Sequence, residues 1–331
     1  MKSMLSTAPG GPETLELSDV AVPEPGPGQV RIAVRAAGVN YPDTLIIRDL
    51  YQMKPPRPFA PGGEVAGIVD AIGSGVQGFA PGDRVLALTG HGGFAEYVCA
   101  DAASVSKIPA DMPFEDAAVF VFTYGTSYHA LKDRGYLRPG NSLFVLGASG
   151  GVGAAAVELG KAMGARVIAG VSSEDKAAFC RDLGADDTIV YPREMDRDAQ
   201  KALSDRIKDL VGPKGLDVAY DAVGGDYAEP VLRAMGWDGR FLVVGFPAGI
   251  PKIPLNLPLL KSCQIVGVFW GGSVRRDPKA HARNVYELFA LYNDGKIRPR
   301  ITARYPLAQA GEALQAMADR KVTGKVVITP E

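Results

Sequence analysis

Short segments in which apolar residues recur characterise the first third of the chain. Residues 29–34 and 65–69 are two such segments, and stretches rich in glycine and proline, such as residues 23–28 and 80–83, lie between them and their neighbours. Short apolar segments bounded by turn-forming residues are typical of β-strands. We therefore predict that the N-terminal third forms a β-rich domain.

From about residue 118 the pattern becomes an alternation of apolar runs and helical periodicities. Residues 142–146 form a short, mostly apolar run, which is typical of a fully buried strand, and residues 152–163 repeat apolar positions at helical spacing. The predicted strands are residues 142–146, 166–171, 188–191, 218–221 and 241–244, and the predicted helices are residues 152–163, 173–183, 205–211 and 227–235. This alternation predicts βαβ units and a parallel sheet with helices on both faces.

The alternation stops after about residue 256. Residues 265–270 predict one further strand, two amphipathic helical stretches follow, and residues 325–328 predict a closing strand. The simplest architecture is an α/β fold in which a doubly wound parallel sheet is inserted into the β-rich domain. We predict that residues 121–261 form the inserted nucleotide-binding domain, and that residues 1–120 and 262–331 form the β-rich domain.

The composition is that of a globular chain with two domains. The chain has 331 residues, of which 47% are hydrophobic and 22% charged, and its formal net charge is -1. A near-neutral balance argues against binding to nucleic acid or to an anionic membrane surface. No apolar stretch reaches the ~18 residues of a spanning helix, and the first ten residues lack the apolar core of a secretory signal.

The cysteines indicate the redox compartment. Cys99, Cys180 and Cys263 are isolated from one another and odd in number, so they form neither a Cys-x-x-Cys pair nor an obvious disulfide framework. We expect reduced and mostly buried thiols, as in a cytoplasmic protein.

A glycine-rich turn, Gly147–Gly153, follows the predicted strand 142–146 and opens the predicted helix 152–163. In this context the backbone can approach a pyrophosphate closely, and the helix N-terminus offers N–H groups and the positive end of its dipole. The alternative is a tight turn with a merely structural role. The surrounding βαβ pattern favours a dinucleotide site.

The end of the second predicted strand selects the dinucleotide. An NAD site expects an acidic residue about 20 residues after the turn, where it holds the ribose 2′-hydroxyl. Here Ser172 and Ser173 occupy that place, and Lys176 lies one helical turn further on. Ser173 could be only a helix cap and Lys176 only a solvated surface residue. The missing acid together with the nearby cation favours NADPH.

Several motifs in order along the chain resemble one family. They are residues 38–43 (GVNYPD), 61–67 (PGGEVAG), 93–97 (GFAEY), 125–131 (GTSYHAL), the glycine turn, 221–225 (DAVGG) and 320–325 (RKVTGK). By these motifs and their order, the chain resembles the medium-chain dehydrogenase/reductase superfamily, in its zinc-free quinone oxidoreductase (ζ-crystallin-like) branch. The resemblance extends over almost the whole chain.

The resemblance implies a chaperonin-10-like (GroES-like) catalytic domain and a Rossmann domain. It implies that Asn40 and Tyr51 face the nicotinamide and are the catalytic candidates, and that Phe269 and Trp270 belong to a strand near both the site and a subunit interface. Tyr51 and Phe246 could instead be ordinary packing residues. Together with the turn and the strand end above, the implied cofactor-binding residues are Asn40, Tyr51, Thr126, Ser149, Gly150, Gly151, Val152, Ser172, Lys176, Tyr191, Val223, Gly245, Phe246, Phe269, Trp270 and Arg320.

The chain departs from the zinc enzymes of that superfamily. They carry cysteine at the place of Asn40, and histidine before glutamate where this chain has Gly63 and Glu64. The histidines of this chain are scattered and lack the paired spacing of metal ligands. We expect no metal site.

A metal-free site restricts the electrophiles that can be reduced. Zinc stabilises the alkoxide-like oxygen of an alcohol or simple ketone, whose parent pKa is near ~15.7. A hydroquinone oxygen resembles the tyrosine phenol, with a pKa of about 10, so roughly 7–8 kcal/mol less charge stabilisation is required. Quinones and conjugated carbonyls are therefore the expected acceptors.

We predict an NADPH-dependent quinone reductase that transfers hydride directly from nicotinamide C4. The alternative is an ene-reductase for an enal, enone or enoyl-CoA. The proton could come from solvent or from Tyr51, although Asp49 replaces a glycine of the motif. Arg57 or Arg275 and Arg276 could meet CoA phosphates, but solvated surface arginines are the more common interpretation. A third possibility is an NADPH-binding protein without catalysis. The apolar segment 263–270 suits either a subunit interface or packing in the core, and a homodimer or homotetramer is expected.

Overall fold

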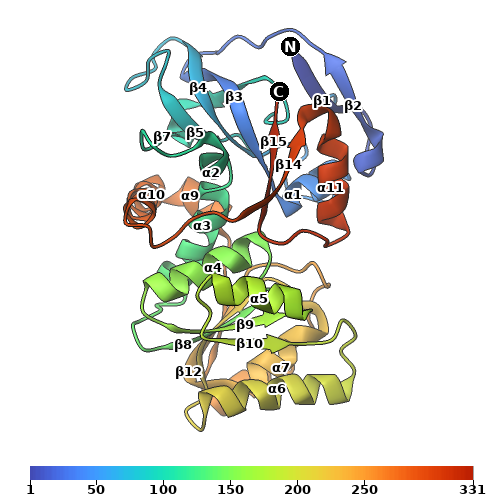
Figure 1. The fold of residues 1–331 in the computed structure, drawn as a ribbon, viewed down its shortest axis with the longest axis vertical. Helices are drawn as coiled ribbons and strands as arrows, with labels where there is room; N and C mark the ends of the chain where they lie inside the picture. Colours follow the sequence, from blue (N-terminus) through green and yellow to red (C-terminus); the bar gives the residue numbers. More distant parts are fainter. Residues whose placement is uncertain (331) are drawn as a thin grey trace. The chain divides into compact units, whose positions relative to one another are not determined.

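The computed structural model describes residues 1–330 and divides into two compact units (Figure 1). Unit 1 comprises Met1–Phe122 together with the C-terminal segment from Pro299, and unit 2 comprises Thr123–Arg298. Within the described residues, none of the helices is both long and apolar enough to cross a bilayer.

Unit 1 is built on a seven-stranded mixed sheet. Its order is β14-β15-β3-β4-β5-β7, and β6 also pairs with β3. A separate two-stranded sheet pairs β1 (Lys2–Ser6) with β2 (Leu15–Asp19). The strands of the larger sheet are β3 (Gln29–Val39), β4 (Glu64–Ile72), β5 (Arg84–Leu88), β6 (Tyr97–Asp101), β7 (Val105–Lys107), β14 (Ile301–Pro306) and β15 (Lys325–Thr329). The predicted β-rich domain and the predicted closing strand are confirmed.

The core of unit 1 follows from the alternation along β3. Val30, Ile32 and Val34 point to one face and are buried, as expected for a strand that covers a core with every second residue. Three helices accompany the sheet: α1 (Tyr41–Ile46), α2 (Phe114–Ala118) and α11 (Ala310–Ala318). Because α1 begins directly after β3, Asn40 lies at the junction between the central strand and a helix.

Unit 2 contains a six-stranded sheet in which every neighbouring pair is parallel. Its order is β10-β9-β8-β11-β12-β13, the doubly wound order of a Rossmann fold. The strands are β8 (Ser142–Leu146), β9 (Arg166–Val171), β10 (Asp187–Val190), β11 (Leu216–Asp221), β12 (Met235–Val243) and β13 (Gln264–Gly267). Leu143–Leu146 are fully buried, as the central strand of a parallel sheet requires.

The helices of unit 2 confirm the predicted alternation. They are α3 (Val121–Tyr128, which begins in unit 1), α4 (Gly151–Ala162), α5 (Glu174–Asp182), α6 (Arg197–Val211), α7 (Ala228–Arg233), α8 (Asn256–Lys261), α9 (Trp270–Arg276) and α10 (Pro278–Asn293). A π-helical segment, His129–Arg134, continues α3.

Two sequence-based expectations are corrected in the region after residue 261. The prediction assigned residues 262–298 to the β-rich domain, but β13 pairs with β12 and this whole segment lies in unit 2. The predicted strand 265–270 is shorter, because β13 ends at Gly267 and Trp270 begins α9. A short apolar run does not by itself distinguish a strand from the start of a buried helix.

Candidate functional site

The winding of the unit 2 sheet reverses between β8 and β11, and the glycine turn lies at the carboxyl end of β8. The N–H groups of Gly147 and Ala148 both donate to the carbonyl of Gly170 on β9, each at 3.1 Å. Gly150 is the N-cap residue of α4. The first turn of α4 therefore presents its N–H groups at the point of a doubly wound sheet where ligands bind.

Close backbone approach explains the glycines of this turn. Gly147 has φ +77°, and a Cβ at Gly153 would lie 2.1 Å from the Gly147 carbonyl oxygen. A Cβ at Gly150 would meet nothing closer than that same oxygen at 3.6 Å. Gly153 thus allows α4 to pack on the turn, whereas Gly150 leaves space in front of the helix. The turn fits a pyrophosphate.

Buried hydroxyl groups support the first turn of α4 from below. Ser127 Oγ donates to the carbonyl of Val152 at 2.8 Å and lies 2.9 Å from the hydroxyl of Tyr220. Because the single Ser127 proton is used on Val152, Tyr220 is the donor of that second bond. Sequence reasoning named Thr126, which is half-buried, and missed both hydroxyl groups beside it. The only signal in the sequence was a second hydroxyl residue directly after Thr126.

Positive charge gathers at the end of β9. Lys176 Nζ donates to Ser172 Oγ at 3.4 Å, while Ser173 caps α5 by accepting from the Lys176 N–H. Burial, and then the nearby charge of Arg193, lower the pKa of Lys176. Within residues 1–330, neither cation forms an ion pair with a carboxylate. The two cations repel each other, so a bound anion such as a 2′-phosphate would stabilise both.

Sequence reasoning missed Arg193, whose position depends on two tyrosines. The Tyr191 ring is buried with its centroid 5.0 Å from that of Tyr227, and its hydroxyl lies beside the Gly147 amide. The Tyr227 hydroxyl donates to the Arg193 carbonyl at 2.6 Å. Tyr191 therefore packs beneath the glycine turn, and Tyr227 holds the segment that carries Arg193.

Two loops meet beside the turn and bring three predicted residues together. Asp221 accepts from the N–H groups of Val223 and Gly224, and the Gly245 N–H donates to the Asp221 carbonyl. The Val223 side chain limits the space at Gly147, and Phe246, 45% exposed, follows Gly245. Burial raises the pKa of Asp221 to about 6.

The neighbouring residues Phe269 and Trp270 have different surroundings. Phe269 is 56% exposed, whereas Trp270 is buried, with its ring edge against Gly125 of α3 and T-shaped to His281. Trp270 is thus brought next to Thr126, and Phe269 remains at the surface.

Asn40, Tyr51 and Arg320 lie in unit 1. Asn40 is buried and joined to three charged groups, Asp43, Glu64 and Lys325. Arg320 is exposed, in a turn with φ +57° directly after α11. The contact of each predicted residue with a cofactor stays a prediction.

Tyr51 is half-buried and packs against the core cluster of unit 1, so its interpretation as a packing residue stays open. Two residues before it, Asp49 has φ +56°, a left-handed conformation that favours glycine. An ion pair of 2.9 Å joins Asp49 to Arg57, whose Nη2 donates to the Ile47 carbonyl.

Among residues 1–330, no group of three or more histidine, cysteine or acidic side chains is arranged to hold a metal ion.

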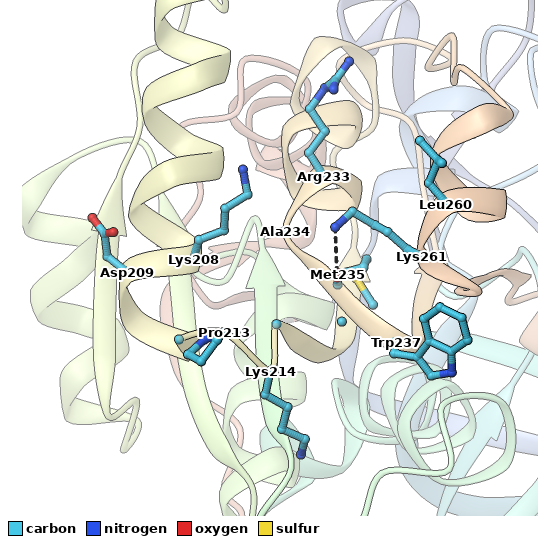
Figure 2. A pocket seen from close by; sticks show the side chains of 13 residues that line it. Lys208, Asp209, Pro213, Lys214, Arg233, Ala234, Met235, Trp237, Leu260 and Lys261 are labelled. Atoms are coloured by element: carbon cyan, nitrogen blue, oxygen red, sulfur yellow. Dashed lines mark hydrogen bonds between the residues drawn. The ribbon is translucent and has the colours of Figure 1, made fainter.

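A pocket of about 660 Å³ lies elsewhere in unit 2, beside the amino ends of β11 and β12 (Figure 2). The last turns of α6, α7 and α8 carry the cations Lys208, Arg233 and Lys261 around it. Lys261 donates to the Met235 carbonyl, and Arg233 pairs with Glu229. Cations at helix C-termini are accounted for by the helix dipole. Cofactors of doubly wound sheets bind at the opposite, carboxyl ends of the strands.

Two family models match the chain. Residues 26–110 match the alcohol dehydrogenase GroES-like domain, and residues 151–287 match the zinc-binding dehydrogenase model. The second match includes β13, in agreement with the placement of that strand in unit 2.

Curated relatives and solved structures cover nearly the whole chain. A quinone oxidoreductase-like protein 2 homolog of Nematostella vectensis is 39% identical over 92% of this chain and 82% of its own length. The quinone oxidoreductase of Homo sapiens is 34% identical over 96% of this chain and 94% of its own. The Escherichia coli quinone oxidoreductase, solved in complex with NADPH, aligns over all of both chains with a TM-score of 0.89 and 29% identity.

The two glycines predict a separation of stability from binding. Gly153→Ala should lower the melting temperature by several degrees and weaken binding of NADPH, the expected cofactor, because its Cβ forces α4 away from the turn. Gly150→Ala should leave the melting temperature unchanged and weaken only NADPH binding, because its Cβ enters the space in front of the helix. Calorimetry and fluorescence titration measure the two effects, and equal melting temperatures for both variants would contradict the packing argument.

Proposed function

The chain belongs to the medium-chain dehydrogenase/reductase superfamily, in its quinone oxidoreductase branch, and on that premise we propose that it is an NADPH-dependent quinone reductase. NADPH, when bound, supplies a hydride from nicotinamide C4. The chain's own residues bind and orient the reactants in this proposal and keep water from the reacting atoms.

The observation that carries the cofactor assignment is the pair of cations at the end of β9. Lys176 and Arg193 lie where an NAD-specific site would hold an acid, and Ser172 adds a hydroxyl donor. The 2′-phosphate on the ribose of NADPH carries the negative charge that would balance these two cations. We therefore assign Lys176 and Arg193 to the 2′-phosphate, and the amides of Ser149–Val152 to the pyrophosphate.

The donor groups of unit 1 favour a quinone as the acceptor. Where the zinc enzymes of the superfamily carry cysteine and histidine, this chain has Asn40 and Gly63. A neutral amide can donate one hydrogen bond to a carbonyl oxygen, which is a modest stabilisation of developing charge. A hydroquinone oxygen requires roughly 7–8 kcal/mol less stabilisation than an alkoxide, so it suits this donor set.

The second candidate function is reduction of an activated double bond, with Tyr51 as proton donor. Asp49 supports this candidate, because its φ of +56° lies in the region that favours glycine, the residue that the motif of related enoyl reductases has at this place. An enoyl-CoA substrate is less favoured. Arg57 is bonded to Asp49 and the Ile47 carbonyl and stacks on Phe59, so it is not available for CoA phosphates.

A cytoplasmic location and a homodimer complete the proposal. The three cysteines are free thiols, which suits a reducing compartment. β13 is an edge strand of the unit 2 sheet, and Ile265 on it is 40% exposed. Nearby α8 exposes Leu259 and Leu260. An uncovered edge with apolar neighbours suits pairing with β13 of a second copy.

The acceptor is tested by NADPH oxidation at 340 nm with EDTA present. We expect rapid turnover with 1,4-benzoquinone or an ortho-quinone, and NADH should be a poor substitute. A preference for a 2-alkenal or crotonyl-CoA would replace the quinone assignment with an ene-reductase. Binding of NADPH without turnover of any of these acceptors would support the non-catalytic alternative.

The two cations predict cofactor selectivity. Lys176→Ala and Arg193→Ala should each raise the KM for NADPH by roughly 10–100-fold, the value of a charge-assisted hydrogen bond, and should change the KM for NADH by less than about twofold. Lys161→Ala is the matched control, since that lysine is paired with Asp186. Steady-state kinetics with both cofactors measures the effect, and equal changes with NADPH and NADH would remove the 2′-phosphate assignment.

The edge strand predicts the oligomeric state. Light scattering should give the mass of two chains for the wild type. Ile265→Lys should reduce the mass to that of one chain, because a charge on the paired edge opposes association. Val22→Lys alters an apolar side chain of the same 40% exposure in unit 1 and should remain dimeric. A monomeric wild type would refute the interface.

A further inference from the structure

A cluster of buried polar side chains surrounds Asn40 in unit 1. Asn40, Asp43, Glu64 and Lys325 are exposed by 7%, 3%, 0% and 4% respectively. Glu64 Oε1 accepts from the N–H of Phe122, and Asp43 accepts from the N–H groups of Asn40 and Gly62. Three ionisable groups are thus enclosed around one amide.

The sheet register places Lys325 in this cluster. β15 pairs antiparallel with β3, with Val326 opposite Val39, so Lys325 lies beside the residue that follows β3. Its Nζ donates to Asn40 Oδ1 at 2.6 Å and to the Val39 carbonyl at 3.3 Å. Lys325, the first residue of β15, therefore contacts the side chain of Asn40, the residue directly after β3.

The two neighbours of Asn40 determine how its amide is oriented. An ammonium group only donates, so it must face Oδ1, and an ionised carboxylate only accepts, so it must face Nδ2. The structure has this orientation, because Asn40 Nδ2 donates to Glu64 Oε2 at 3.4 Å while Oδ1 accepts from Lys325. The reversed amide would set donor against donor and acceptor against acceptor. These bonds use Oδ1 and one N–H, and the second N–H of Nδ2 is left to donate.

Stability alone is a weak reason for this arrangement. Enclosing an ammonium and two carboxylates carries a large desolvation penalty, and well-packed apolar residues are often at least as stabilising. Burial raises the pKa values of Glu64 and Asp43, while the charge of Lys325 opposes this shift, and burial lowers the pKa of Lys325 against the attraction of Glu64 and Asp43. The clear structural product of these charges is one fixed orientation of Asn40.

We propose that Lys325 is a positioning residue, which fixes the Asn40 amide so that one N–H of Nδ2 donates to a carbonyl oxygen of the reactants. The inference rests on the proposed function, since it needs Asn40 to meet those reactants. The carbonyl belongs either to the acceptor or to the carboxamide of the nicotinamide, and the test below distinguishes them. Lys325 itself touches neither.

A double-mutant cycle tests whether Lys325 acts through Asn40. Lys325→Met and Asn40→Ala should each lower kcat by about tenfold, the value of one hydrogen bond to developing charge, and the double variant should be no slower than the slower single variant. Lys325→Arg should restore part of the rate, because guanidinium also donates to Oδ1. Ile328→Ala, on the same strand, should lower the melting temperature and keep kcat.

Affinity for NADPH, measured by fluorescence titration, gives a readout apart from turnover. A non-additive loss of affinity identifies the nicotinamide carboxamide as the acceptor of the bond, and a non-additive loss of kcat alone identifies the carbonyl of the substrate. The positioning role would be overturned if the fold-losses of the two single variants multiplied in the double variant, because the residues would then act independently. It would also be overturned if Lys325→Met lost only thermal stability. If the wild-type protein reduced none of the tested acceptors with NADPH, the proposed function would be refuted instead. The affinity measurements of the double-mutant cycle would still decide the role of Lys325.

Discussion

The approach of α4 to the glycine turn is the constraint on which the geometry of unit 2 depends. A side chain at Gly153 would lie 2.1 Å from the Gly147 carbonyl, so only glycine allows the helix to start directly above the end of β8. The same turn is bonded to Gly170 on β9 and rests on Tyr191, while Ser127 and Tyr220 hold the first turn of α4. One close contact thus sets the position of the N–H groups that a pyrophosphate requires.

Features carried by neighbouring residues could be predicted from the sequence. The strand, turn and helix at residues 142–163 are contiguous, and the missing acid at Ser172 with Lys176 one turn away is a local signal. Arg193 could not be found in this way. Its place near Lys176 depends on the path of the segment after β10. The Tyr227 hydroxyl fixes that segment by a hydrogen bond to the Arg193 main-chain carbonyl. Tertiary hydrogen bonds to main-chain carbonyls leave no pattern in the sequence.

Long-range register explains the other omissions. Lys325 reaches Asn40 across 285 positions of the chain, through the pairing of β15 with β3, and its motif alone indicated only a closing strand. Residues 262–298 were assigned to the wrong unit for a similar reason. An apolar run predicts that a strand exists but not which sheet it joins, and β13 joins β12 through backbone bonds that any sequence can make.

The two groups of cations differ in how their charge is compensated. Lys325 has Glu64 and Asp43 as internal counter-charges, so its ammonium is used within unit 1 to orient an amide. Lys176 is partly buried, and the exposed Arg193 lies close enough for its charge to lower the pKa of Lys176. Among the described residues neither cation has a carboxylate partner. A buried cation with its own counter-ions has little net attraction left for a ligand, whereas an uncompensated pair gains most from an incoming dianion. Of these two groups, the one at the end of β9 therefore has positive charge available to a ligand, and there it can distinguish a phosphorylated ribose from one that carries only hydroxyl groups.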